Sequence, residues 1–522
     1  MTMLNATLSS GLAQFESHLP WTPYFTLAAV SSLLVGLLGT LYAYFFPSGN
    51  DANKIHALRG FSAVNAWMFF NKRYDFLWSN FDKTGHDLFS FKVLHHQVVA
   101  MSGDEARKIF FNEKKLSFLE GYRLLRGGVG HAIESHGSLL NDRDIKAEED
   151  DSTIMFKQRL LKILHRDRLQ DVIPTLFSDI SRCMENWGAE GTIDPFKDIY
   201  DLVFQMTVRM ASCQELATDP AMVQKMGDLY WKLEQNATLV SLLLPWFPST
   251  ARKTTRQASK GLSDMVSHYV EVRQKADVPN LDAIDVLIAD GADTPSIVHF
   301  VLGTIFAGVV NTGMISCWVL LYLGFNNACK QKTIAEVQNL IAKYTNTSSS
   351  EPIHQRLSTA PISTWEDEMP VTESVIRETL RILGSGTPLR RNLADDLRVA
   401  GKTIDKGAFM VYNSADVHLN ERFYPEPLKF DPDRFNLTGE DDTQGKAPFL
   451  AWGTGRHPCA GMKIAKLEIK MILALFLYRY EYTLVDQSGK PAKQLPQLDR
   501  NTIQKKKPMG EPCYLMYRKV AE

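Results

Sequence analysis

The sequence predicts a mainly α-helical fold with a smaller β region, preceded by one N-terminal transmembrane helix. Three observations lead to this prediction. Residues 25–46, FTLAAVSSLLVGLLGTLYAYFF, are apolar and uncharged. Helical patterns dominate from about residue 151 to 345. Strand alternation is confined to short segments, chiefly residues 89–103 and 397–412 and the C-terminal end.

Composition indicates an ordinary globular protein. The chain has 522 residues, of which 45% are hydrophobic and 22% charged, enough for one large domain or two smaller ones. Its 58 Lys and Arg balance 59 Asp and Glu, so it lacks the basic excess of nucleic-acid-binding proteins and we expect no nucleic-acid partner. The six cysteines are widely spaced without a CxxC pair, which argues against a disulfide scaffold or a cysteine-rich zinc site.

The apolar segment 25–46 is predicted to be a membrane anchor, because 22 uncharged residues can span ~30 Å of hydrocarbon as a helix. A cleaved signal peptide is the competing interpretation, but residues 1–24 contain no Lys or Arg and the apolar segment is long for one. Lys54 and Arg59 follow the segment, which places the remainder of the chain in the cytosol and residues 1–24 in the lumen.

This topology has two consequences for the rest of the chain. Asn5, in the sequon Asn5-Ala6-Thr7, would be the sequon exposed to the glycosylating compartment. Residues 47–53 would be a short polar linker, and residues 54–522 the cytosolic domain.

A second apolar stretch begins at Thr294, and no Asp, Glu, Lys or Arg occurs between Asp293 and Lys330. It could be a second membrane span or the buried central helix of a large domain. A span would place Asn311 and Thr312 in the middle of the bilayer, where polar groups are costly. The sequence therefore favours a buried central helix.

Cys459 lies in the stretch WGTGRHPCAG, residues 452–461, immediately before a helical pattern. It could be a nucleophile, a structural cysteine or a metal ligand. A nucleophile needs an aligned base, and His457 is too close along the chain to be a good one. Three glycines let the backbone turn sharply and approach a flat partner, and a helix beginning near Ala460 would stabilise a thiolate. These features favour a thiolate ligand.

The same stretch resembles the haem-binding loop of cytochromes P-450, aromatic-x-x-Gly-x-basic-x-Cys-x-Gly. The resemblance implies a haem b cofactor with Cys459 as the axial thiolate ligand of its iron. The surrounding cofactor-binding positions would be Trp452, Gly455, Arg456, His457 and Gly461. Trp452 stands where the family usually has Phe, and its indole N–H needs a partner. His457 replaces a common Arg, as in sterol-demethylase-like members, and would contact a haem propionate.

Further motifs follow the order that the family has. Glu378 and Arg381 resemble its ExxR pair, and Arg434 in FDPDRF, residues 430–435, resembles the Arg that joins this pair in a buried network. Arg391 stands where a propionate-binding Arg is expected, with the adjacent Arg390 as the alternative. The helix that often supplies a Trp and a basic residue to the propionates, residues 156–168, has no Trp, which leaves Lys157 or Arg159 as candidates.

On the central helix, Asn311-Thr312 stands where the family commonly has an acid and then Thr, a variant resembling the sterol 7-hydroxylase and prostacyclin synthase branch. The resemblance implies that Thr312, with Asn311, holds water and relays protons to iron-bound dioxygen. The alternative is structural, with Thr312 bonding back to a helix carbonyl. Phe306, Val309 and Val310 would lie near the distal pocket.

The resemblance as a whole implies a microsomal monooxygenase of fungal biosynthetic type, single-pass in the endoplasmic reticulum membrane, with residues 54–522 as the cytosolic catalytic domain. Its substrate would be a hydrophobic terpenoid, sterol, alkaloid or polyketide. Electrons would come from NADPH through a membrane-bound NADPH-cytochrome P-450 reductase, because no GxGxxG follows a strand; cytochrome b5 is a second candidate donor. A basic face, Arg456, Lys463, Lys466 and Lys470, could dock an acidic reductase or simply be solvated.

Two other functions stay open. One is a haem-thiolate isomerase that needs no reductase, which the absence of the acid beside Thr312 allows. The other is a non-enzymatic haem sensor or carrier in the membrane, against which the distal Thr312 argues.

Overall fold

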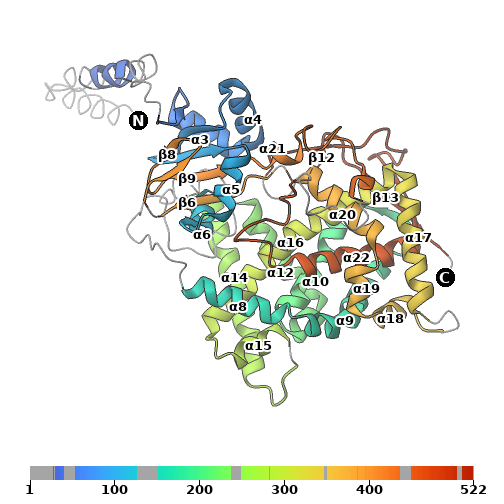
Figure 1. The fold of residues 1–522 in the computed structure, drawn as a ribbon. Helices are drawn as coiled ribbons and strands as arrows, with labels where there is room; N and C mark the ends of the chain where they lie inside the picture. The colour runs from blue at the N-terminus through green and yellow to red at the C-terminus, as the bar shows by residue number, and fades with distance from the viewer. Residues whose placement is uncertain are drawn as a thin grey trace, which may run out of the picture.

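The computed structural model describes residues 28, 30–39, 53–93, 95–125, 151–236, 249–280, 282–345, 350–384, 386–393, 395–435, 448–502 and 508–520. The glycosylation site expected at Asn5 lies outside these residues, as do both ends of the predicted anchor. The described part is mainly helical with a smaller β region, as predicted (Figure 1).

The described helices beyond residue 53 are α3 (Ser62–Asn71), α4 (Arg73–Thr84), α5 (Asp104–Asn112), α6 (Phe118–Leu125), α8 (Asp151–Ile163), α9 (Arg166–Glu185), the π-helical turn η1 (Pro195–Ile199), α10 (Tyr200–Ala211), α11 (Gln214–Thr218), α12 (Pro220–Gln235), α14 (Thr250–Gln274), α15 (Ala283–Ala289), α16 (Thr294–Phe325), α17 (Asn327–Tyr344), α18 (Ile353–Ser358), α19 (Ile362–Asp367), α20 (Pro370–Leu383), α21 (Ala415–His418), the 3-10 turn η2 (Pro432–Phe435) and α22 (Met462–Arg479). The strands are β1 (His56–Ala57), β2 (Leu88–Val93), β3 (His96–Met101), β4 (Leu116–Ser117), β5 (Glu190–Ile193), β6 (Leu389–Asn392), β7 (Leu397–Val399), β8 (Lys402–Ile404), β9 (Phe409–Tyr412), β10 (Tyr480–Val485), β11 (Gln497–Leu498), β12 (Pro508–Met509) and β13 (Tyr514–Lys519).

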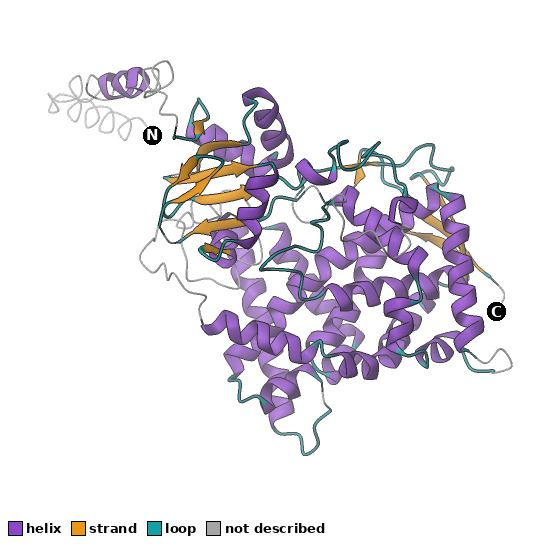
Figure 2. Ribbon diagram, viewed as in Figure 1, coloured by secondary structure: helices purple, strands orange, loops and turns teal. Residues whose placement is uncertain are grey.

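The main sheet has six strands in the order β1-β2-β3-β9-β6-β4 and lies at one end of the molecule, beside the helical body (Figure 2). Its strands come from both ends of the chain: β3 pairs parallel with β9, and β9 pairs antiparallel with β6. Side chains alternate between two buried faces. One face holds Leu389 and Phe409 against α3 and α4, and the other holds Phe110 of α5.

The helix α16 runs through the middle of the helical body (Figure 1). Asp293 caps its first turn by accepting from the Ser296 N–H, and Pro295 occupies the first turn, where no hydrogen bond is lost. Its most apolar window has a mean hydropathy of 1.7 and is 78% buried inside the protein. A helix covered by its own chain in this way is a core helix, so the prediction of a buried central helix is confirmed.

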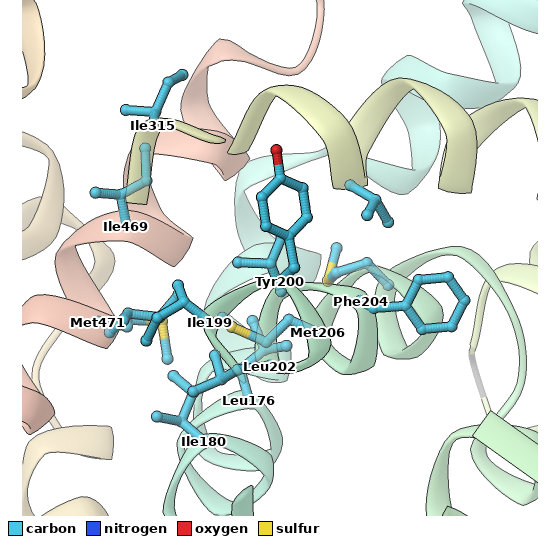
Figure 3. Close-up of a cluster of buried hydrophobic side chains, with 14 of the residues drawn as sticks. Leu176, Ile180, Ile199, Tyr200, Leu202, Phe204, Met206, Ile315, Ile469 and Met471 are labelled. Atoms are coloured by element: carbon cyan, nitrogen blue, oxygen red, sulfur yellow. The ribbon is translucent and has the colours of Figure 1, made fainter. Parts of the chain in front are cut away.

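The helix α16 packs against α10 and α22 in the main apolar core. Figure 3 shows Tyr200 of α10 in the main apolar core, with Ile315 of α16 and Ile469 of α22 on one side of it and Phe204 of α10 on the other. The Tyr200 hydroxyl donates to the Val310 carbonyl at 3.3 Å, and a methyl group at Gly313 would lie 2.7 Å from the Tyr200 ring. Gly313 therefore allows α10 to pack closely against α16.

Within the predicted anchor, the structure describes an apolar helix at Val30–Gly39 whose large side chains are exposed, for example Leu33 at 74%. This helix alone is shorter than the ~20 residues that a membrane span needs. The anchor over residues 25–46 and the boundaries derived from it therefore stay predictions.

Candidate active site

The loop that carries Cys459 is folded tightly on itself; residues 450–461 are called the Cys loop below. The Cys459 N–H donates to the Trp452 carbonyl at 2.6 Å. Gly453 and Gly455 have φ angles of 70° and 65°, which side chains disfavour. A methyl group at Gly455 would lie 2.3 Å from the Phe111 carbonyl oxygen at the end of α5. Glycine there lets the loop contact α5, where the Arg456 N–H donates to the same oxygen at 3.0 Å.

The Cys459 thiol differs in exposure from the other cysteines. All six lie in described residues, and Cys459 is the exposed one, whereas Cys183 is half-buried and the other four are buried. Nearby protein atoms still desolvate the Cys459 sulfur and raise its pKa, while a hydrogen bond from the Gly461 N–H lowers it. The sulfur is thus open on one side and screened on the others. A cationic metal on the open side would favour the thiolate.

Basic and aromatic side chains surround this loop. The His457 ring stacks on the Phe118 ring of α6, with centroids 5.5 Å apart and planes 23° apart. Arg390 of β6 also packs against the Phe118 ring. Its guanidinium carbon lies 5.0 Å from the centre of the Phe118 ring and 5.1 Å from that of the Phe110 ring. The Trp452 Nε1 atom is buried and has no hydrogen-bond partner in the described part of the chain. Trp, at the position where the family usually has Phe, therefore leaves one N–H donor free within the Cys loop.

Arg390 and Arg391 occupy opposite faces of the sheet because they are consecutive in β6. Arg391 packs over the Phe409 ring and has Glu120 Oε2 3.5 Å from its guanidinium. Arg390 is 3% exposed and donates to the Leu389 carbonyl at 2.8 Å, and no described carboxylate forms an ion pair with it. Burial lowers the Arg390 pKa to about 10. Arg390 is thus a buried cation without a counter-ion, and it lies across Phe118 from His457. Such a cation is suited to bind a carboxylate.

The buried ionic network expected from the sequence is assembled. Arg381 binds both oxygens of Glu378 at 2.7 Å, and both side chains are fully buried. Arg434 reaches Glu378 Oε1 at 3.2 Å from η2, and the Asp431 N–H donates to the same oxygen at 3.1 Å. Arg381 also donates to the His418 carbonyl at 2.7 Å. The network thus ties α20 to the segment that leads toward the Cys loop.

Between residues 300 and 323, the helix α16 is buried except along one accessible stripe. Asn311 is exposed and lies on this stripe, and its amide donates to the Ala307 carbonyl at 3.3 Å. The spacing of three and four residues places its members on one face of the helix. The stripe consists of Gly303, Thr304, Ala307, Gly308 and Asn311.

The neighbouring residues on α16 are not on this face. Thr312 is 3% exposed, and Phe306, Val309 and Val310, which the sequence placed near a distal pocket, are 7%, 0% and 3% exposed. The structure therefore separates Asn311 from Thr312 by burial. The sequence analysis placed the large apolar residues of α16 near the distal pocket, whereas the accessible positions are the small residues between them.

The basic residues on α22 do not form the open basic surface that the sequence predicted. Lys470 is 1% exposed and donates to the Trp365 carbonyl at 2.8 Å, so it is a buried core residue and not part of a surface face. Lys466 is paired with Glu373, and Lys463 with Glu366. Among the candidates on α8, Arg159 lies 3.7 Å from Asp290, which already supplies its counter-charge.

Comparison with known proteins gives the family. The sequence model named Cytochrome P450 matches residues 64–509. The chain belongs to the cytochrome P450 family. It is 29% identical over 473 residues to the cytochrome P450 monooxygenase AacuE of Aspergillus aculeatus, covering 87% of this chain and 91% of that protein. It is 28% identical to the cytochrome P450 monooxygenase nsrP of Aspergillus novofumigatus, covering 79% of each chain.

More distant P450 proteins agree with this result. A sterol 14alpha-demethylase of Mycolicibacterium vanbaalenii is 23% identical, with 76% of this chain and 83% of that one covered. The solved structure of a retinoic acid bound cyanobacterial P450, CYP120A1, superposes with a TM-score of 0.71 at 19% identity over 90% of this chain and all of that one, which shows the fold.

Membership establishes the general chemistry. The protein is a cytochrome P450 monooxygenase: the family holds haem through a cysteine thiolate and receives electrons from a redox partner. The residues of this chain fit such a group, because the exposed Cys459 thiol and the free Trp452 N–H lie in the Cys loop and the buried Arg390 lies next to it, across Phe118 from His457. The haem, when bound, supplies the activation of dioxygen, and the protein positions substrate and protons.

Proposed function

We propose that Cys459 is the thiolate ligand of the haem iron in a membrane-anchored monooxygenase that oxidises a hydrophobic natural-product intermediate. The observation that carries the proposal is the exposure of the Cys459 thiol, alone among six cysteines, in a glycine loop at the start of α22. Metal ligation needs a sulfur that an external group can reach, and the other cysteines are at least half-buried. Burial raises the thiol pKa of Cys213 to about 12 and of Cys513 to about 11, which disfavours a thiolate at either.

The haem propionates would be held by Arg390 and His457. Their placement around Phe118 supports this role, and the missing counter-ion of Arg390 favours it over Arg391, whose charge Glu120 offsets. Arg456, Gly455 and Gly461 would shape the backbone at the ligand. Trp452 would cover the sulfur, and its indole N–H would donate toward the sulfur or the porphyrin edge.

Asn311 would hold a water that relays protons on the haem side of α16. An amide can donate and accept hydrogen bonds at once, so it can order a water without being titrated itself. Thr312, buried beside it, would help Asn311 to hold this water. Ala307 and Asn311 are the exposed members of the stripe, and a substrate would lie against them.

The substrate class is proposed from the family and from the fungal relatives, which are named as cytochrome P450 monooxygenases. A terpenoid, sterol, alkaloid or polyketide would suit an apolar helix face with one amide. We place the protein in the endoplasmic reticulum membrane, with residues 54–522 in the cytosol and lipid contacting the anchor. NADPH-cytochrome P-450 reductase, with cytochrome b5 as an auxiliary donor, would supply electrons at the surface around Arg456 and Lys463.

The ligand assignment is tested by the spectrum of the reduced protein under carbon monoxide. Wild-type protein should show the strongly red-shifted Soret band of thiolate-bound haem, and Cys459→Ser should lose it. Cys183→Ser is the matched control, because Cys183 is the next most accessible cysteine and should keep the band. A wild-type spectrum in Cys459→Ser would overturn the assignment.

A rearrangement enzyme without a reductase is the second candidate, which the amide of Asn311 in place of an acid favours. Membranes that contain the protein, with and without NADPH and reductase, should be fed candidate pathway intermediates and the products identified by mass spectrometry. Product that requires both additions supports the monooxygenase reaction. Product formed equally without them identifies an isomerase, and no turnover of any intermediate would leave the haem-sensor function.

A further inference from the structure

The imidazole of His418 joins three parts of the protein in its interior. His418 is the last residue of α21 and is 0% exposed. Its Nε2 atom accepts a hydrogen bond from the Leu450 N–H at 2.9 Å, and its Nδ1 atom lies 2.8 Å from the Gly384 carbonyl oxygen. A backbone N–H can only donate and a carbonyl can only accept, so Nε2 is unprotonated and Nδ1 carries the proton. These two bonds fix one neutral tautomer.

Each end of this bridge leads to a part of the candidate haem site. Leu450 is the first residue of the Cys loop, and its carbonyl accepts from the Gly453 N–H at 2.9 Å. Gly384 follows the last turn of α20, which carries Glu378 and Arg381. The His418 carbonyl itself accepts from Arg381 at 2.7 Å. A single residue therefore connects the buried Glu378–Arg381 pair to the start of the Cys loop.

Glycine at position 384 is required by this arrangement. A methyl group there would lie 2.4 Å from His418 Nδ1 and 2.8 Å from its Cε1 atom. The imidazole consequently touches the backbone of Gly384 with no space for a side chain. Glycine at position 384 is therefore consistent with the position of the His418 ring.

We propose that His418, in its neutral Nδ1–H tautomer, is a positioning residue that holds the Cys loop in the geometry for thiolate ligation. The inference rests on the proposed role of Cys459 as the ligand. Leu450 is 8% exposed, so without the Nε2 acceptor its N–H would be buried and unsatisfied. The loop would then move to reach another acceptor, and the sulfur would move with it.

Two substitutions separate the two hydrogen bonds. In His418→Gln, the terminal amide oxygen can take the place of Nε2 and accept from Leu450, while the Nδ1–H donor is lost. In His418→Asn, the amide nitrogen can take the place of Nδ1, while the acceptor for Leu450 is lost. If the acceptor positions the loop, the Asn variant should lose the red-shifted carbon monoxide band on the order of tenfold faster than the Gln variant.

Tyr424→Phe is the matched control. It removes a hydrogen bond of 3.1 Å from the Tyr424 hydroxyl to the Pro448 carbonyl, two residues before Leu450, without touching the imidazole bridge. The measurement on haem-loaded full-length protein is the ratio between the rate of band loss and the rate of loss of helical circular dichroism. Positioning predicts that His418→Asn raises this ratio and that Tyr424→Phe leaves it unchanged.

The outcomes distinguish this inference from the assignment of Cys459. A wild-type ratio in both His418 variants, with the band abolished in Cys459→Ser, overturns the positioning role alone. Retention of the band in Cys459→Ser overturns the ligand assignment instead. If neither His418 variant folds, Gly384→Ala, which displaces the ring while leaving its nitrogens, should raise the same ratio, and a wild-type ratio there overturns the positioning role.

Discussion

Arg390 and Arg391 are neighbours in β6, but of the two only Arg391 has a described carboxylate near its guanidinium, Glu120 at 3.5 Å. Arg390, 3% exposed, has the faces of Phe110 and Phe118 and one backbone carbonyl instead. Desolvation without a counter-ion disfavours the charged form, which explains the lowered pKa of Arg390. A carboxylate ligand beside Arg390 would stabilise its charged form and so offset the effect of burial on its pKa.

This contrast predicts different effects on haem retention. Arg390→Met should raise the rate of haem transfer to apomyoglobin on the order of tenfold or more, because a charge-assisted hydrogen bond of about 1.5–3 kcal/mol is lost. Arg391→Met should have a smaller effect. Loading both variants with haem dimethyl ester should remove the difference, since the ester carries no carboxylate. Equal transfer rates with ordinary haem would show that Arg390 does not bind a propionate.

The network around Glu378 predicts a large loss of stability from a small chemical change. Glu378→Gln retains the size of the side chain but leaves Arg381, which is 0% exposed, without its counter-ion. Breaking a buried ion pair in this way costs about 3–5 kcal/mol. Denaturant unfolding followed by circular dichroism should show this decrease in the free energy of unfolding.

The control residue is Asp433, which precedes Arg434, the third member of the Glu378 network. Asp433 pairs with Lys332 at 3.0 Å, and both side chains are more than half exposed. Asp433→Asn should change the free energy of unfolding by only about 0–1 kcal/mol. A similar cost for both variants would mean that the Glu378 network contributes no more than a surface pair.

How far the sequence predicted this site depends on how local each feature is. The Cys loop and the Glu378–Arg381 pair were identified because their spacing along the chain already determines their geometry, by tight turns in one case and one helical turn in the other. The burial of α16 within the protein was predicted because Asn311 and Thr312 make its uncharged sequence a poor membrane span. Lys470 was misplaced because a helix pattern does not show that Glu373 and the Trp365 carbonyl enclose it.

The features that the sequence missed depend on contacts between distant segments. His418 is 32 residues from Leu450 and 34 from Gly384, so nothing local indicates its bridge. The choice between Arg390 and Arg391 depends on Glu120, 271 residues before Arg391. Nothing in the helical pattern after the Cys loop shows that Glu468 is buried, because its surroundings come from other segments.

Glu468 predicts an inverse dependence of stability on pH. It is 4% exposed, and burial raises its pKa from 4.5 to about 8. The folded state therefore holds a proton that the unfolded state releases near pH 4.5, so this contribution to stability is fully present below about pH 4.5 and is lost as the pH rises through about 8. Glu468→Gln stays neutral, so its free energy of unfolding should exceed that of the wild type by more at pH 9 than at pH 5.

Glu373 provides a control of opposite sign. Its pKa is lowered: burial, the largest effect, raises it, but the combined effects of Lys470 and Lys466 outweigh burial. Its contribution is present above the unfolded pKa and is lost as the pH falls, so Glu373→Gln should be most damaging at neutral and high pH. An advantage of Glu468→Gln that does not change between pH 5 and pH 9 would mean that Glu468 does not carry the proposed proton.

The surface near the N-terminus predicts how the protein behaves without its anchor. Phe61, Val64 and Trp67 lie one turn apart at the start of the body and on α3, and they are 57%, 55% and 51% exposed. Exposed aromatic and aliphatic side chains on one helix face insert into the boundary of a bilayer. Deletion of residues 1–47 should therefore release the protein from membranes only partly, as measured by sedimentation with vesicles.

Replacing Phe61, Val64 and Trp67 by Ser in the truncated chain should release the remaining fraction. Val278→Ser with Leu428→Ser is the control, because these residues are 71% and 66% exposed but lie on other segments, and their loss should leave sedimentation unchanged. The haem spectrum checks that each variant is folded. Complete release by the deletion alone, with the spectrum intact, would show that the anchor is the sole membrane contact, and loss of haem on the deletion would contradict a separable anchor.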